Sequence, residues 1–203
     1  MRFLLKEQPY EKPVASGQLR YFKHEGATGA AESWRYTAAF DNYHFLRVDL
    51  DGRKSSGHTY LYNLLLNPAG QPEQLKYRFY TAGWRIAGQL LFENGEILSV
   101  HDLNGERTER FFPDTGAFWF PSAVGLGLMA SHVGGESVTA LTLDSALDAE
   151  NRPHLTPIQV EAAVTQQNET ITIAWNRTWR KLTLGSKGFV QTMTRADGLQ
   201  AMS

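Results

Sequence analysis

Hydrophobic and polar residues alternate from residue 84 to residue 112, which is typical of β-strands with one buried face. Two Asn-Gly pairs, Asn94-Gly95 and Asn104-Gly105, interrupt this alternation. Such pairs between alternating hydrophobic residues are the strongest short-range signal for two-residue β-hairpin turns. The stretch is therefore predicted to form three antiparallel strands joined by two tight turns.

The positions of the two turns also predict the register of these strands, and with it the residues that share a face. Counting outward from the turns places His101 opposite both Gly88 and Thr108, and Ser99 opposite Arg110. The predicted buried face mixes apolar and polar residues: Trp84, Ile86, Gly88, Leu90, Phe92, Ile97, Ser99, His101, Leu103, Thr108, Arg110 and Phe112.

A glycine inside a strand often marks the close approach of a ligand or of another backbone. Gly88 is therefore expected to leave space above the imidazole of His101. An apolar pocket with a few polar anchors is the usual composition of a small-molecule site. The predicted ligand-binding residues are Trp84, Gly88, Leu90, Ser99, His101, Thr108, Arg110 and Trp119. The structural alternative is a core histidine whose hydrogen bonds are made by Thr108 or Ser99.

Further apolar or alternating segments predict about a dozen strands in all. They lie at residues 19–24, 33–40, 43–50, 59–66, 75–80, 138–143, 158–165, 171–175, 179–184 and 189–195. Asp51-Gly52 is a third two-residue turn signal, which would place Asp49 opposite Lys54 as a charge pair. Residues 1–17 are expected to be an irregular lead-in, and residues 26–31 a loop.

A short helix is the favoured prediction for Pro121 to Val133, with Gly134-Gly135 as its stop signal. The alternative for this segment is a glycine-spaced strand with Val124, Leu126 and Leu128 on one face. The prediction for residues 1–203 is a single all-β domain. We expect an antiparallel barrel or a two-sheet clam of about a dozen strands, with at most one or two short helices. Either architecture closes or covers the sheet edges, which otherwise promote aggregation.

Composition narrows the possible partners and cofactors. The net charge of -1, from 20 basic and 21 acidic residues, gives no electrostatic reason to expect a nucleic-acid partner. The absence of cysteine excludes disulfides and thiolate metal sites, and the six histidines show no zinc spacing, so no metal or cofactor is expected. The apolar run Phe3-Leu4-Leu5 is too short for a signal peptide or a membrane span, which favours a cytoplasmic protein.

The order of segments also resembles a known family. Alternating strands from Leu75 to Phe112 are followed by the aromatic-proline segment 118–122 and by strands that end near Lys187-Gly188-Phe189-Val190. This order is similar to that of bacterial glycolipid-binding proteins, which are single-domain β-barrels related in shape to lipid carriers. The resemblance implies a barrel that takes a lipid or glycolipid, and it carries over no site residue.

Three functions are compatible with these observations. The leading hypothesis is binding of an amphipathic or apolar small molecule of the lipid or glycolipid class, with His101 and Arg110 holding its polar head. The first alternative is a cofactor-free hydrolase or isomerase in which His101 is the general acid or base. The second is a protein–protein interaction module, in which residues 118–129 form an exposed apolar patch and the chain forms a homodimer.

Overall fold

The structure of the protein is a computed structural model. It describes residues 7–24, 26–130, 132–133, 137–144, 155–185 and 187–203, without the side chains of Trp84 and Asp144. Fifteen strands, one α-helix and one short 3-10 helix form within these residues. In chain order they are β1 (Lys12–Lys23), β2 (Gly26–Ala38), η1 (Phe40–Asn42), β3 (His44–Gly52), β4 (His58–Leu66), β5 (Pro72–Thr81), β6 (Trp84–Glu93), β7 (Glu96–Leu103), β8 (Glu106–Pro113), β9 (Phe118–Trp119), α1 (Ala123–Ala130), β10 (Ser137–Asp144), β11 (Thr156–Gln167), β12 (Thr170–Trp175), β13 (Thr178–Leu184), β14 (Val190–Arg195) and β15 (Gln200–Met202).

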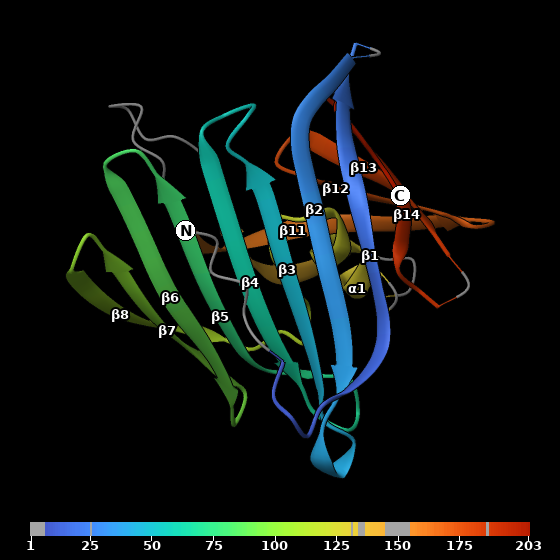
Figure 1. Cartoon of the computed structure of the whole chain (residues 1–203). Helices are drawn as coiled ribbons and strands as arrows, with labels where there is room; N and C mark the ends of the chain where they lie inside the picture. The colour runs from blue at the N-terminus through green and yellow to red at the C-terminus, as the bar shows by residue number, and fades with distance from the viewer. Residues whose placement is uncertain (1–6, 25, 131, 134–136, 145–154, 186) are drawn as a thin grey trace. The chain divides into compact units, whose positions relative to one another are not determined.

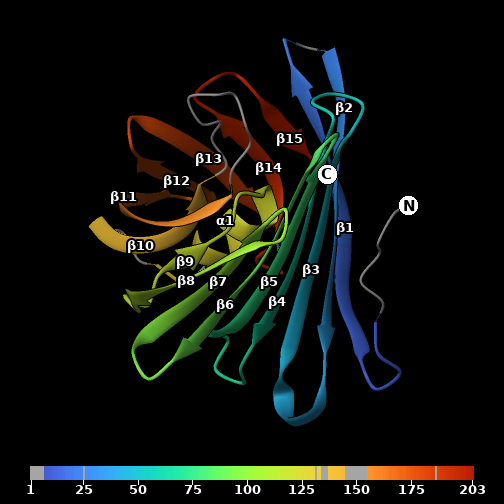
Figure 2. The same cartoon turned by 90° about the vertical axis from the view of Figure 1, so that its left-hand side faces the viewer.

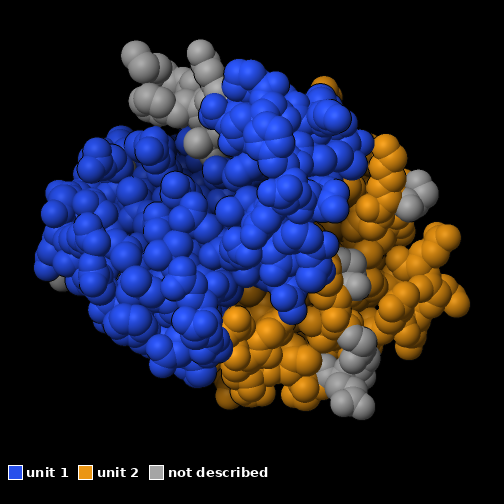
Figure 3. Space-filling view, turned by 90° about the horizontal axis from the view of Figure 1, so that it is seen from below, with its two compact units in different colours: residues 1–18, 32–113 blue, residues 19–31, 114–203 orange. Residues whose placement is uncertain are grey.

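Hydrogen bonds connect all fifteen strands in the order β8-β7-β6-β5-β4-β3-β2-β1-β15-β14-β13-β12-β11-β10-β9. The all-β prediction with few short helices is confirmed. The chain divides into two compact units, which are coloured separately in Figure 3: unit 1 holds residues 1–18 and 32–113, and unit 2 holds residues 19–31 and 114–203. Strands β1 and β2 contribute residues to both units.

The first two strands are longer than the sequence pattern predicts. Strand β1 begins at Lys12, so the predicted irregular lead-in is wrong for residues 12–17. Strand β2 begins at Gly26, so the predicted loop at residues 26–31 is also wrong. These residues are mostly small, and they give no alternating hydrophobic signal. They become strands because β1 and β2 pair with each other through their backbones.

Strands β3 to β8 of unit 1 form an antiparallel meander, each beside the next along the chain (Figure 1). The predicted register of the last three strands is confirmed, with His101 opposite both Gly88 and Thr108. The turn residues Asn94, Gly95, Asn104 and Gly105 have φ angles of 54°, 80°, 53° and 97°. These left-handed backbones are what the two-residue hairpin turns require.

The core of unit 1 consists of side chains that this register places side by side on one face of the meander. Figure 2 shows the strands of the meander from a second direction. One row of opposed residues is wholly apolar, and each member is 0% exposed: Leu46, Leu64, Leu75 and Leu90. The next row contains more polar groups: Val48, Tyr62, Tyr77, Gly88 and His101. The polar groups predicted from the sequence therefore lie beside a leucine core.

The predicted turn at Asp51-Gly52 is wrong. Strand β3 continues to Gly52, which lies opposite His58, so Asp49 lies opposite Leu61 rather than Lys54. The chain reverses through residues 53–57 instead, where three backbone N–H groups donate to the carbonyl of Gly52 over 2.8 to 3.1 Å. These hydrogen bonds satisfy the carbonyl of Gly52 and close the loop over residues 53–57.

In unit 2, the predicted helix is confirmed as α1, which contacts β9, β13 and β14. It ends at Ala130, before the predicted end at Val133, and the expected stop signal Gly134-Gly135 lies outside the described residues. The Ser122 hydroxyl caps its first turn by accepting a hydrogen bond from the backbone N–H of Gly125 over 2.7 Å. A Cβ atom at Gly127 would lie 2.2 Å from a methyl carbon of Val190. The glycine therefore permits close packing between the helix and β14.

The predicted exposed patch at residues 118–129 is wrong. Phe118, Trp119 and Phe120 are 9%, 2% and 0% exposed, and Leu126 and Met129 are buried as well. These side chains belong to the core of unit 2, because an isolated turn of helix becomes stable only when its apolar surface is packed. Among the described residues, no helix combines the length and the apolar character needed to cross a membrane.

Candidate functional site

Strands β1 to β4 line a hollow of about 410 Å³ within unit 1. Small-molecule pockets typically measure about 300–1,000 Å³, so the volume is sufficient for a ligand. The described lining residues are Ser16, Gly17, Gln18, Ser33, Trp34, Arg35, Arg47, Val48, Asp49 and Leu61. They combine apolar side chains with hydroxyl, amide and charged groups.

Trp34 forms a rigid part of this lining and is only 8% exposed. A Cβ atom at Gly17 would lie 2.8 Å from the indole Nε1 of Trp34. Real Cβ atoms essentially never come this close to another atom, so a side chain at position 17 would force the indole to move. Gly17 therefore lets the indole lie directly against the backbone of β1.

Two charged residues of β3 belong to the same lining. Arg47 and Asp49 are two residues apart, so they lie on one face of the strand, and they are 6% and 7% exposed. Leu61 of β4 lies opposite Asp49 and is 5% exposed. Buried charges are costly unless they are paired or hydrogen-bonded, which makes this part of the sheet chemically distinctive.

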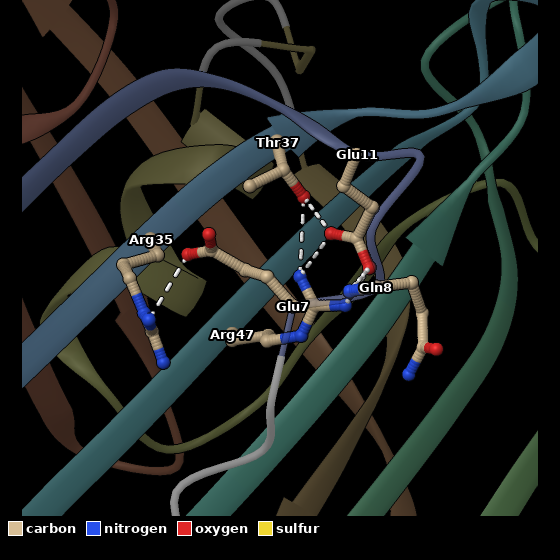
Figure 4. A network of polar contacts seen from close by, with 6 residues as sticks. All are labelled: Glu7, Gln8, Glu11, Arg35, Thr37 and Arg47. Atoms are coloured by element: carbon tan, nitrogen blue, oxygen red, sulfur yellow. Dashed lines mark hydrogen bonds and ion pairs between the residues drawn. The ribbon is translucent and has the colours of Figure 1, made fainter.

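A buried ion pair holds Arg47 in place (Figure 4). Its two terminal nitrogens donate to the two carboxylate oxygens of Glu11, over 2.7 and 2.5 Å. The Thr37 hydroxyl donates to the same carboxylate and accepts a hydrogen bond from Arg47 over 3.1 Å. The backbone N–H of Gln8 adds a further hydrogen bond to Glu11 over 2.9 Å. This bidentate geometry is the strong form of an arginine–carboxylate interaction.

The pKa of Glu11 reflects this environment. Burial raises the pKa of a carboxyl group, but the hydrogen bonds from Arg47 and Thr37 and the charge of Arg47 outweigh burial here. The pKa of Glu11 is therefore lower than its ordinary value of 4.5. Glu11 is ionised at neutral pH, and the segment before β1 is held to β2 and β3 by a charge-assisted pair.

One polar group of the lining, on Arg47, has an unused hydrogen-bond donor, and Arg35 beside it is already paired. The Nε–H of Arg47 is buried and has no hydrogen-bond partner among the residues that the structure describes. Arg35 forms an ion pair with Glu7 over 3.0 Å, and both side chains are partly exposed, at 39% and 30%. Exposed ion pairs contribute little to stability, so Arg35 can exchange its partner at low cost.

The predicted cluster around His101 is assembled as the register requires, but it is not an open pocket. A Cβ atom at Gly88 would lie 2.1 Å from the ring carbon Cζ of Tyr77 and 2.2 Å from its hydroxyl oxygen. The expected space above His101 is therefore occupied by Tyr77, whose ring centroid lies 6.4 Å from that of His101. The close approach predicted at Gly88 is therefore present, but the group that approaches is the side chain of Tyr77 and not a ligand.

The other predicted site residues differ in their surroundings. Leu90 and Ser99 are buried at 0% and 3% exposure, His101 is half-buried, and Thr108 and Arg110 are exposed. The side chain of Trp84 lies outside the described part of the structure. Trp119 is buried in unit 2, whereas the other seven predicted residues belong to unit 1.

Tyr77 itself has an unusual environment. Burial raises the pKa of its phenol, so the group remains neutral. Its hydroxyl is buried without a hydrogen-bond partner among the described residues. A buried polar group of this kind normally costs free energy.

The sequence interpretation missed the hollow between β1 and β4 because it ended β3 too early. A turn at Asp51-Gly52 would place Asp49 at the end of a hairpin, whereas the actual pairing places it in the middle of two strands. Arg47 and Asp49, spaced by two and separated by the apolar Val48, were the available signal. No group of three or more metal-ligating side chains occurs among the described residues.

Comparison with protein-family models and with curated proteins finds no match. The crystal structure of a DUF1089 family protein from Pseudomonas aeruginosa is similar, with a TM-score of 0.52 and 13% identity, over 94% of this chain and 95% of that chain. A β-barrel-like protein of the domain of unknown function DUF1849 from Brucella abortus has a TM-score of 0.52 and 12% identity, over 92% and 94% of the two chains. These similarities show a β-barrel-like fold, and they confirm the family resemblance only to that extent.

Substitution of Gly88 tests whether this glycine accommodates Tyr77. We expect Gly88→Ala to reduce the free energy of unfolding by about 1–3 kcal/mol, because the new methyl group overlaps the phenol ring. In a Tyr77→Ala background the same substitution should cost much less, since the space is vacant. Urea unfolding of the two single variants and the double variant measures this coupling. Additive losses of unfolding free energy would contradict the conclusion that Gly88 accommodates the Tyr77 ring.

Glu11→Gln tests the buried ion pair. We expect it to lower the free energy of unfolding at neutral pH by about 3–5 kcal/mol, because Arg47 keeps its buried charge without a counterion. The folded pKa of Glu11 lies below 4.5, so this contribution is complete above that value and is lost as the pH falls through the folded pKa. Urea unfolding at a series of pH values should show wild type and variant converging in acid.

The matched control is Glu7→Gln, which removes the exposed partner of Arg35 in the same segment. Its cost should stay below about 1 kcal/mol at every pH. Equal losses of unfolding free energy in the two variants would show that the buried pair of Glu11 stabilises the fold no more than the exposed pair of Glu7 does.

Proposed function

We propose that unit 1 binds an amphipathic small molecule in the hollow lined by β1 to β4. One observation carries this proposal: apolar walls lie beside a buried guanidinium group that has an unused N–H donor. Ligand sites are mostly apolar with a few fixed polar groups that orient the ligand, and the hollow has this composition. The β-barrel-like fold of the two similar structures is compatible with this proposal, because β-barrels are among the folds that bind small molecules.

The polar end of the ligand should carry an oxygen acceptor. Glu11 fixes both terminal nitrogens of Arg47, so the direction of the Nε–H donor is set before a ligand arrives. A preorganised donor loses little conformational entropy on binding, which increases affinity. Because Glu11 already compensates the charge of Arg47, a neutral oxygen such as an ester carbonyl suits this donor as well as a carboxylate does.

The apolar part of the ligand would pack against Trp34 and Leu61, whereas the side chain of Val48 lies on the opposite face of β3, beside Tyr62. The tight contact between Trp34 and Gly17 keeps the indole in place, so this wall does not have to be ordered by the ligand. Each methylene group that leaves water contributes about 0.8 kcal/mol. A chain of several methylene groups therefore supplies most of the affinity, which favours a lipid-like molecule.

Filling the hollow tests this proposal. We expect dodecanoate and its methyl ester to bind wild-type protein saturably, and Leu61→Trp to weaken both at least tenfold by occupying the lining. Isothermal titration below the critical micelle concentration measures the affinities. Leu65→Trp is the matched control, because Leu65 lies on the same face of β4 but is not among the lining residues.

Thermal unfolding of each variant identifies any general loss of structure. Unchanged binding by Leu61→Trp would place the ligand elsewhere. Absence of binding by folded wild-type protein would remove support for a lipid-like ligand. Native mass spectrometry of protein purified without detergent then shows whether any small molecule accompanies the chain.

The enzyme alternative has its own requirement. A general acid or base must change its protonation state near the working pH and must be reachable by the substrate. On this hypothesis the ring protons of His101 shift between pH 5 and 8 in an NMR titration, with His101→Gln used to assign the signal. A flat curve would contradict acid–base catalysis by His101 and leave the binding proposal unaffected.

A further inference from the structure

Strand β8 is the terminal strand of the sheet order, next to β7 (Figure 1). Among the described residues it pairs with β7 alone. Every residue of the strand except Phe112 is exposed, and the side chain of Phe111 is 68% exposed. An open edge presents unpaired backbone N–H and C=O groups, which can pair with another strand.

The charges along β8 form a palindrome of opposite signs. Glu106 and Arg107 precede Thr108, and Glu109 and Arg110 follow it. When the strand is reversed about Thr108, each acidic residue falls on a basic one. Opposite charges directly across an antiparallel pair are stabilising, and like charges are destabilising. The strand is therefore complementary to a second copy of itself.

We propose that two copies of this chain form a symmetric dimer by antiparallel pairing of their β8 strands, with the two-fold axis at Thr108. Glu106 of each copy then lies opposite Arg110 of the other, and Arg107 lies opposite Glu109. The contact is the same on both sides, so it closes after two copies. The dimer covers an edge that is otherwise open to further pairing.

The charges also select one register. A shift of one residue in either direction places Glu106 opposite Glu109, or Arg107 opposite Arg110. A shift of two places Arg107 opposite Arg107, or Glu109 opposite Glu109. Each neighbouring register therefore contains a pair of like charges, whereas the register centred on Thr108 contains none.

The residues around the palindrome fit the same arrangement. Phe111 lies opposite Gly105 of the other copy, and a glycine has no side chain to obstruct the ring. Within one copy, Arg107 forms an ion pair with Glu109 over 2.6 Å, and these side chains are 63% and 53% exposed. Such an exposed pair contributes little to stability, so it can exchange for the same contact between copies.

Charge reversal tests the dimer. Sedimentation velocity over a concentration series should show wild-type protein associating to a dimer, and association should weaken at high salt. Arg110→Glu should weaken it at least tenfold by placing two glutamates opposite each other. Combining Glu106→Arg with Arg110→Glu should restore association, because each pair is again of opposite sign.

Arg53→Glu is the control for a general effect of charge, since Arg53 is an exposed residue of unit 1 that lies outside β8. It should leave association unchanged. Wild-type protein that remains monomeric at every concentration would overturn the proposal. So would a dimer that persists in Arg110→Glu, or a double variant that fails to recover although it is folded.

Cysteine cross-linking tests the register independently, because the chain has no cysteine of its own. In Thr108→Cys the two new residues lie opposite each other, with Cα atoms about 4.5–5.5 Å apart, which suits a disulfide. In Glu106→Cys they lie about 13 Å apart along the strands, which is too far. Mild oxidation should therefore yield a covalent dimer of the first variant only. Equal yields, or none from Thr108→Cys, would contradict this register.

Discussion

Backbone pairing between neighbouring strands determines which side chains share a face, and the rest of unit 1 depends on this constraint. The pairings from β3 to β6 align Leu46, Leu64, Leu75 and Leu90 in one buried row. The alternation of a strand then places Arg47 on the opposite face. The leucine core and the charged lining of the hollow are therefore two results of one register. A shift by one residue would exchange them.

The ion pair between Glu11 and Arg47 depends on that register, because the register places Arg47 on the face where it contacts Glu11. Removing two charges from water is expensive, and good geometry must compensate for it. Two hydrogen bonds between the charged groups, and others from Thr37 and Gln8, supply this compensation. The same contacts orient the remaining N–H of Arg47. A structural pair and a candidate ligand-binding donor therefore share one side chain, so the stability of the sheet and the chemistry of the hollow are linked.

The sequence predicted the meander of β6 to β8 because Asn-Gly turns and alternation both act over short distances. It did not predict the hollow, whose residues come from four strands between Ser16 and Leu61. Asp51-Gly52 resembled a tight turn, but the chain reverses through a longer loop with hydrogen bonds to Gly52. It identified Gly88 as a point of close approach, yet pattern alone could not say that Tyr77 fills the space. Propensity and periodicity reveal strands, whereas packing between distant strands decides which spaces stay open.

The packing of Tyr77 over Gly88 bears on how this fold could acquire a new ligand through substitution. The phenol ring fills the space over Gly88, whereas the strand pairing around it is made by backbone groups. Replacement of this one side chain would create a vacancy of the size of a phenol beside Ser99 and His101, among groups already placed to recognise a polar aromatic compound. A fold of this kind can thus acquire a second binding specificity in a single step, without any change in strand order or turns.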